Sequence, residues 1–186
     1  MGNRLPTICA LIISAAALAG PARAAGVEDK LQVCSSCHGA AGVPTDPKTM
    51  PIIWGQTEAY LTKQLHDYRA DDRPNPIMKA MAGSLTQEEL RPAAKYFAAK
   101  MWPAGHPPAA NATPPAGIAQ CQACHQPDLK GGLPAPRLVG QSYEYLIKQM
   151  TSFANGERTN NMDMVKVMQE LAPDQREAMA RYIAGL

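Results

Sequence analysis

Apolar side chains recur three or four residues apart along much of the chain, which is the spacing of one face of an α-helix. One such run spans 57–69 and contains Tyr60, Leu61, Leu65 and Tyr68. Helices are predicted at 27–37, 57–69, 86 to about 100, about 142–153 and 173–184. No run alternates apolar and polar residues as a half-buried strand does. The pattern therefore predicts an all-α fold.

Two helix starts carry additional signals. Thr86 and Glu89 have the spacing of a capping box, in which the two side chains bond to each other's backbone N–H groups. Pro173 suits a first helical turn. Pro92 falls about two turns into its predicted helix, where it removes a hydrogen bond. We expect a kink or a late helix start there.

The second half of the chain repeats the first. Segments 51–64 and 136–149 both read Pro-x-x-x-Gly-Gln-x-x-x-Tyr-Leu-x-Lys-Gln. Further on, the Arg-x-Asn element at 73–75 matches that at 158–160, and Tyr96 matches Tyr182. Repetition over this length indicates two versions of one module.

A proline-rich segment separates the two halves. Residues 103–117 contain five prolines and no Lys, Arg, Asp or Glu. Such a segment should be extended and semi-rigid, because proline fixes φ and lacks a backbone N–H. We therefore predict an N-terminal domain at 25–102, a linker at 103–117 and a C-terminal domain at 118–186.

The first 24 residues have the features of a secretory signal peptide. Arg4 precedes an apolar run from Ile8 to Ala19, and 22–24 form a small-x-small cleavage site. The run is too short for an ordinary membrane span. We expect cleavage after Ala24 and a periplasmic protein; an uncleaved anchor is the alternative. Cys9 would leave with the signal.

The chemistry of the chain lies in two C-x-x-C-H motifs: Cys34, Cys37 and His38, and Cys121, Cys124 and His125. This motif is typical of covalent attachment of a c-type haem. Two thiols bond to the vinyl groups of one porphyrin, and the His becomes an axial ligand of the iron. Disulfides and a four-cysteine zinc site are alternatives, but neither explains the His after each pair.

Methionines are candidates for the second axial position. A thioether favours the reduced iron and raises its potential relative to two imidazoles. Each half has a methionine-bearing loop before its last helix, with Met78 and Met81 in the first. The second loop has Met162, Met164 and Met168.

The repeat selects Met78 and Met164, since each precedes an aligned Leu by seven residues. Met81 and Met168 then fill the core. Of the two histidines outside the motifs, His66 is expected to be an exposed helix residue, and His106 lies in the linker.

Charge excludes some partners. Without Arg4 and Arg23, the 18 Lys and Arg fall to 16, equal to the 16 Asp and Glu. The mature polypeptide is then formally neutral and has no basic stripe for nucleic acid.

These motifs resemble the cytochrome c4 family of dihaem electron-transfer proteins. The likeness rests on both C-x-x-C-H motifs, the Gly-Gln-x-x-x-Tyr-Leu-x-Lys-Gln segments at 55–64 and 140–149, both Arg-x-Asn elements, and Met78 and Met164. It covers nearly the whole mature chain. It implies two tandem class I cytochrome c domains, each wrapped around one covalently bound haem, with His38 and Met78, and His125 and Met164, on the irons. Pro92 departs from the family pattern, in which that helix is uninterrupted.

The function predicted is periplasmic electron transfer between a respiratory donor and an acceptor such as a terminal oxidase. Redox partners would be a membrane-bound oxidase, a quinol-oxidising complex or a periplasmic dehydrogenase, and the role is compatible with a monomer that meets the membrane peripherally. No catalytic residues are expected. The alternatives are a dihaem peroxidase and a dihaem subunit of a dehydrogenase complex of the flavocytochrome c sulfide dehydrogenase type.

Overall fold

A computed structural model describes residues 27–103 and 113–186, and within these ranges the chain forms eight α-helices and no β-strand. None of these helices is both long enough and apolar enough to cross a bilayer. The predicted signal peptide at 1–24 and positions 104–112 of the predicted linker lie outside the described residues. The helices are α1 (Val27–His38), α2 (Glu58–Ala70), α3 (Pro76–Gly83), α4 (Gln87–Ala98), α5 (Ile118–His125), α6 (Tyr143–Ala154), α7 (Met162–Glu170) and α8 (Pro173–Ala184).

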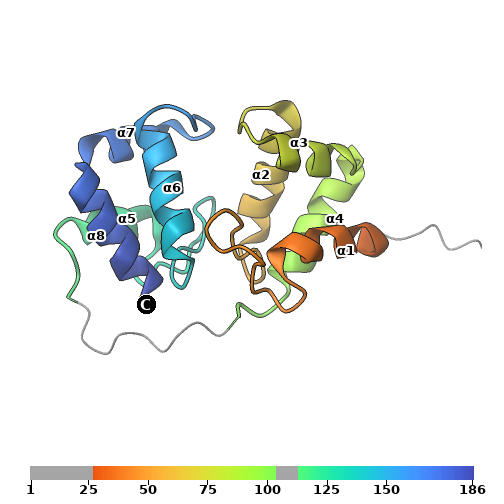
Figure 1. Cartoon of the computed structure of the whole chain (residues 1–186), viewed down its shortest axis with the longest axis horizontal. Coiled ribbons are helices and arrows are strands. Elements are labelled where there is room, and N and C mark those ends of the chain that lie inside the picture. The colour runs from red at the N-terminus through yellow and green to blue at the C-terminus, as the bar shows by residue number, and fades with distance from the viewer. Residues whose placement is uncertain (1–26, 104–112) are drawn as a thin grey trace, which may run out of the picture.

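The helices form two groups that lie side by side, with α2 and α6 facing each other in the middle (Figure 1). In the N-terminal domain α2 packs against α3 and α4, and α1 packs against α4. In the C-terminal domain α6 packs in the same way against α7 and α8. The all-α prediction is confirmed, and the helix order repeats as the sequence repeat does.

Each domain has its own apolar core. In the N-terminal domain the core consists of Leu31, Leu61, Leu85, Leu90, Ala93, Ala94 and Phe97. In the C-terminal domain it is larger and contains Leu129, Val139, Leu146, Met150, Phe153, Val165, Met168, Met179, Ala180 and Ile183, with Cys121 at its edge. Burial of these side chains is the main force that holds each helix group together.

The helix α4 corrects the expectation at Pro92. It begins at Gln87 and continues through Pro92 to Ala98, so a late start and an interruption are both wrong. The start is fixed because the Glu89 carboxylate accepts the Thr86 N–H at 2.7 Å. Pro92 removes one N–H from the helix, and packing of Leu90, Ala93 and Phe97 in the core outweighs that loss.

The methionine-bearing segments are helices rather than the predicted loops. Asn75 caps α3 by accepting the Met78 N–H at 2.9 Å, and Asn161 caps α7 by accepting the Met164 N–H at the same distance. The side-chain cap satisfies an N–H that a helix start would otherwise leave unpaired. The structural partner of Asn75 is thus Asn161, and the sequence match of Asn75 with Asn160 is wrong by one residue.

Two glutamines join the domains through backbone groups. Gln56 accepts the Arg137 N–H at 2.7 Å and donates to the Arg137 carbonyl at 3.0 Å. Gln141 makes the equivalent bonds to Ile52, at 3.0 and 3.1 Å. Each side-chain amide therefore both donates to and accepts from the backbone of one residue in the other domain. The two glutamines occupy equivalent positions in the internal repeat, and so do their partners, Arg137 and Ile52.

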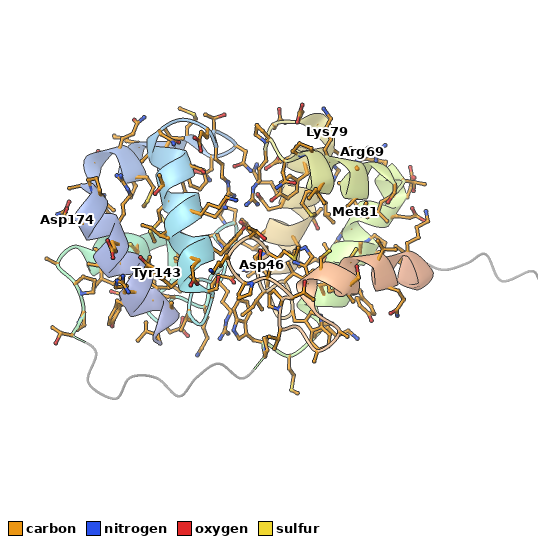
Figure 2. All side chains as sticks on the ribbon, viewed as in Figure 1. Asp46, Arg69, Lys79, Met81, Tyr143 and Asp174 are labelled. Carbon is orange, nitrogen blue, oxygen red and sulfur yellow. The ribbon has the colours of Figure 1, made fainter. Side chains whose placement is uncertain are left out.

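The loop of the N-terminal domain that carries Asp46 also reaches across. Asp46 lies near the middle of the molecule (Figure 2). The hydroxyl of Ser142, at the start of α6, donates to the neighbouring carbonyl of Pro47. Thr57 is the repeat partner of Ser142, but its buried hydroxyl has no hydrogen-bond partner among the described residues. The interface is therefore only approximately symmetric.

Candidate haem-binding sites

The two C-x-x-C-H motifs form the last turns of α1 and α5. Cys34, Cys37 and His38 lie three and four residues apart, so they share one face of α1. The helix ends directly after His38, because Gly39 takes a φ of 90°, which is not helical. Glycine is required there, since a Cβ would lie 2.0 Å from the Val43 carbonyl oxygen. The motif is thereby placed at a helix end, where the chain turns sharply away.

Each motif histidine is anchored by a backbone carbonyl. His38 Nδ1 lies 2.8 Å from the Pro51 oxygen, and His125 Nδ1 lies 2.8 Å from the Pro136 oxygen. A carbonyl can only accept, so Nδ1 carries the proton and Nε2 keeps its lone pair. This is the tautomer that a metal-binding imidazole needs, and its ring is already oriented. The residues present therefore fit an iron porphyrin.

Burial controls the charge state of both histidines. His38 and His125 are 8% and 5% exposed. Burial lowers the pKa of each imidazole, and the carbonyl bonds of Pro51 and Pro136 only partly oppose this effect. Both rings are thus neutral at pH 7, which leaves Nε2 available as a ligand.

The cysteines are thiols in a partly apolar environment. Burial raises the pKa of Cys34 and of Cys121, whereas Cys124 is exposed. All four motif cysteines are free, and the two pairs lie on α1 and α5, on opposite sides of the molecule (Figure 1). The pairs therefore do not meet as the four ligands of a zinc ion, and each pair can serve its own domain.

The candidate methionine ligands occupy equivalent positions. Met78 and Met164 are each the third residue of their helix, three positions after the capping asparagine, and both are half-buried. Met168 is 2% exposed and belongs to the C-terminal core, while Met162 is 66% exposed. Met81 lies on α3, half-buried and one turn after Met78 (Figure 2).

Two tyrosines that recur in the repeat lie at the contact between the domains. Tyr60 and Tyr145 point their hydroxyls at arginines of the opposite domain. Trp54 packs against Gly42, and its buried Nε1 has no partner among the described residues. His66 is half-buried on α2, not exposed as expected, and lines a groove that also includes Leu133 of the C-terminal domain.

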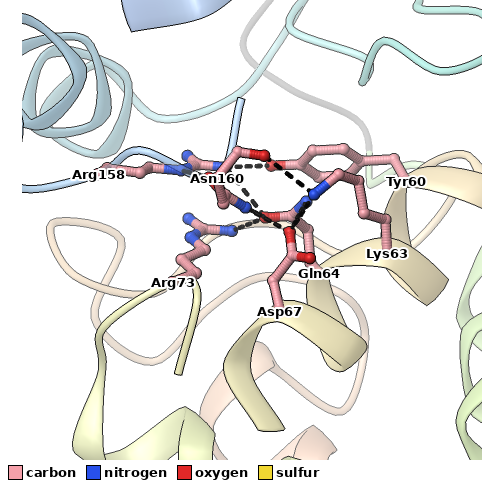
Figure 3. A network of polar contacts seen from close by, with 7 residues as sticks. All are labelled: Tyr60, Lys63, Gln64, Asp67, Arg73, Arg158 and Asn160. Carbon is pink, nitrogen blue, oxygen red and sulfur yellow. Dashed lines mark hydrogen bonds and ion pairs between the residues drawn. The ribbon is translucent and has the colours of Figure 1, made fainter. Parts of the chain in front are cut away.

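Sequence reasoning missed a polar network between the domains. Figure 3 shows Tyr60, Lys63, Gln64 and Asp67 of α2 meeting Arg73 from the loop after α2, and Arg158 and Asn160 from the loop between α6 and α7. Gln64 and Arg158 are 6% and 7% exposed. The repeated Lys-Gln and Arg-x-Asn elements were the available signal, because buried polar residues that recur in both halves need a shared partner.

Comparison with known proteins agrees with this geometry. Residues 116–186 match the family model described as cytochrome c. A cytochrome c4 of Pseudomonas aeruginosa is 35% identical, over 91% of this chain and 93% of its own. The chain belongs to the cytochrome c4 family.

Other relatives fit this assignment. The crystal structure of reduced recombinant cytochrome c4 from Pseudomonas stutzeri superposes with a TM-score of 0.75 at 32% identity, over 86% of this chain and 96% of that chain. A thiosulfate dehydrogenase electron acceptor of Stutzerimonas stutzeri is 30% identical, over 87% of this chain and 82% of its own.

Membership in the cytochrome c4 family fixes the cofactor and the class of function. The fold consists of two tandem class I cytochrome c domains, and the protein binds two covalently attached haem c groups, for which Cys34 and Cys37 and Cys121 and Cys124 provide the cysteine pairs. Cytochrome c4 proteins transfer electrons and are not enzymes. The predictions of fold, cofactor and electron transfer are confirmed.

Proposed function

We propose that the chain is a periplasmic electron carrier that takes one electron per haem from a respiratory donor and passes it to an acceptor such as a terminal oxidase. The observation that carries the proposal is the matched anchoring of His38 and His125, each by a proline carbonyl at 2.8 Å. Both domains present an imidazole in the same tautomer, so we infer that both bind a haem in the same way and that both haems carry electrons.

The chain's own residues have distinct parts in this function. When bound, each haem supplies an iron that alternates between ferric and ferrous states. Cys34 and Cys37, and Cys121 and Cys124, tether the two groups. His38 and His125 would each bind one iron through Nε2, and Met78 and Met164 would each supply a thioether as the second ligand. An iron held by both side chains would exchange electrons and not ligands.

Two features support the methionine assignment. Met78 and Met164 occupy the same position behind a capping asparagine, and each backbone N–H is fixed by that cap at 2.9 Å. The cap holds the first turn of a short helix rigid, so the thioether is presented from a fixed backbone. Met168 is committed to core packing and Met162 faces outward.

Export to the periplasm is proposed from the sequence at 1–24. The expected mature chain begins at Ala25. Mass spectrometry of protein isolated from the periplasmic fraction should give the mass of residues 25–186 plus two haems. A mass that includes residues 1–24 would contradict cleavage.

A dedicated dehydrogenase partner is the second candidate. The similarity to a protein named thiosulfate dehydrogenase electron acceptor favours it over a dihaem peroxidase. Purification from the native host under mild conditions separates a free carrier from a dedicated subunit. A free carrier elutes alone and is reduced by several donors, whereas a subunit co-elutes in fixed ratio with a catalytic chain.

A further inference from the structure

The peptide group that anchors His125 is also held by the opposite domain. The Pro136 carbonyl, which lies 2.8 Å from His125 Nδ1, belongs to the same peptide group as the Arg137 N–H. That N–H donates to Gln56 Oε1 of the N-terminal domain at 2.7 Å. The carbonyl and the N–H of a trans peptide point in opposite directions. One peptide group therefore connects Gln56 on one side with His125 on the other.

The N-terminal histidine has the same arrangement with the domains exchanged. His38 Nδ1 lies 2.8 Å from the Pro51 carbonyl oxygen. The Ile52 N–H of that peptide group donates to Gln141 Oε1 of the C-terminal domain at 3.0 Å. Two series of hydrogen bonds thus cross the interface in opposite directions, and each begins at a glutamine of one domain and ends at the motif histidine of the other.

Both glutamine amides are fixed in orientation. Gln56 Oε1 also accepts the N–H of Thr57 at 2.9 Å, and Gln141 Oε1 that of Ser142 at 3.1 Å. Because an N–H can only donate, these bonds fix which end of each amide is the oxygen. Both glutamines are 4% exposed. Water therefore does not compete for the peptide groups, and hydrogen bonds in such surroundings are electrostatically stronger than in water.

The peptide group between Pro136 and Arg137 is closely packed. Gly131 has a φ of 79°, and a Cβ there would lie 2.4 Å from the Arg137 nitrogen and 2.7 Å from the Pro136 oxygen. The Gly131 N–H donates to the His125 carbonyl at 2.9 Å. The Arg137 guanidinium lies 4.4 Å from the centre of the ring of Trp102, which belongs to the N-terminal domain. Both domains thus hold this peptide group in place.

Hydrogen bonds in series affect one another. A peptide group that donates its N–H becomes a better acceptor at its carbonyl, because each bond polarises the next. A stronger bond from Nδ1–H to that carbonyl raises the basicity of the imidazole as a metal ligand. A more basic ligand stabilises ferric iron and lowers its potential. Each glutamine therefore acts on the histidine of the opposite domain without touching it.

We propose that Gln56 and Gln141 are positioning residues for electron transfer, each of which tunes the haem of the opposite domain through the peptide group that anchors its histidine. This tuning requires that His38 and His125 bind the irons, as in the proposed function, and it does not depend on the identity of the electron donor or acceptor. Domain docking is then part of the redox chemistry, because separating the domains would weaken both histidine anchors.

The first test compares Gln56→Met and Gln141→Met with Tyr145→Phe in the dihaem protein. Methionine has nearly the size of glutamine but does not make the amide's hydrogen bonds. Tyr145→Phe removes another contact across the same interface, the hydroxyl that accepts from Arg73 at 2.9 Å. It alters neither proline peptide group, so it is the matched control for weaker docking alone.

Nuclear magnetic resonance of the reduced, diamagnetic protein reports each Nδ1–H separately. In Gln56→Met we expect the His125 proton to move upfield, because its hydrogen bond weakens, while the His38 proton keeps its position. Gln141→Met should give the reverse. A redox titration followed by the same method should show a raised midpoint potential at the haem of the opposite domain only. Tyr145→Phe should leave both protons in place.

The crossed pattern separates tuning from simple docking. Shifts at the histidine of the variant's own domain, or equal shifts at both, would show that the glutamines only hold the domains together and would overturn the proposal. Unchanged Nδ1–H signals in both folded variants would also overturn it. The ring protons of His38 and His125 should show the strong upfield shifts of a haem-bound imidazole. Absence of those shifts would contradict the ligand assignment itself, and the proposal with it.

A second test needs no substitution. Hydrogen exchange of the reduced dihaem protein should show strong protection of the Arg137 and Ile52 amides, because each donates to a buried glutamine of the opposite domain. Exchange of these two amides as fast as in an unstructured peptide would overturn the proposal, whatever the variants do.

Discussion

The side-chain amide of Gln56 pairs with the backbone of Arg137 across the domain interface, through hydrogen bonds of 2.7 and 3.0 Å. Gln141 repeats this arrangement with Ile52. The Gly-Gln dipeptide that recurs in both halves is therefore a docking element: each glutamine substitutes for a peptide group and fixes the opposite domain in register.

Replacing Gln56 with Ala should weaken domain docking. The change leaves the Arg137 N–H and carbonyl without their partner, at a cost of about 1–3 kcal/mol for each unsatisfied buried group. Gln56→Glu keeps one acceptor but replaces the donor with a carboxylate oxygen that faces the Arg137 carbonyl at a buried position, so it should weaken docking as well. Chemical denaturation of the dihaem protein measures the loss, with the exposed Gln169→Ala as control. Equal stability of Gln56→Ala and Gln169→Ala would show that this pair does not hold the domains.

Replacing Met78 or Met164 with Ala should open the iron of one domain only. Loss of a thioether ligand removes the stabilisation of the ferrous state, so the potential of that haem should fall. The reduced variant should bind carbon monoxide at half of its haems, while the wild type binds little. Met81→Ala and Met162→Ala are the matched controls, and carbon monoxide binding in Met81→Ala but not in Met78→Ala would move the ligand to Met81.

The asparagine caps should link helix stability to ligation. Asn75→Ala or Asn161→Ala removes the acceptor for the N–H of Met78 or Met164, which costs about 0.5–2 kcal/mol of helix stability. We expect faster carbon monoxide binding at the affected haem, because the short helix opens more often. Asn75→Asp or Asn161→Asp keeps a capping oxygen and should restore slow binding; if it does not, the cap is not the cause.

Acid should weaken the contact between α1 and α4. A hydrogen bond from Lys30, with a second from the Thr86 N–H, lowers the pKa of Glu89 below its usual value of 4.5. The folded state thus favours ionised Glu89, so its contribution is present above that value and is lost as the pH falls through the lowered pKa. Melting temperatures between about pH 6 and pH 3 should fall less steeply in Glu89→Gln than in the wild type. Glu170→Gln, at an exposed position, should behave as the wild type does.

Much of the fold could be predicted from periodicity and from the repeat. The long helices follow apolar spacing, and the two motif histidines follow from the C-x-x-C-H pattern. The short helices α3 and α7 were missed because eight or nine residues carry little periodic signal. Their start signals are Asn75 and Asn161, and the second was hidden by the neighbouring Asn160.

The interface could be found only in part. Gln64 and Gln149 recur in the repeat, but sequence spacing along one helix cannot tell which buried face meets its own core and which meets the other domain. Arg73 and Arg158 follow helix ends, where an arginine is ordinarily a solvated residue. Their burial depends on how two domains dock, which local sequence does not encode.

The most direct test of the account is a redox titration of the mature protein followed by absorption and magnetic circular dichroism spectroscopy. Two one-electron steps are predicted, with a methionine-to-iron signature at both ferric haems. A single redox centre, or a haem whose spectrum lacks the methionine signature and changes on addition of peroxide, would contradict it.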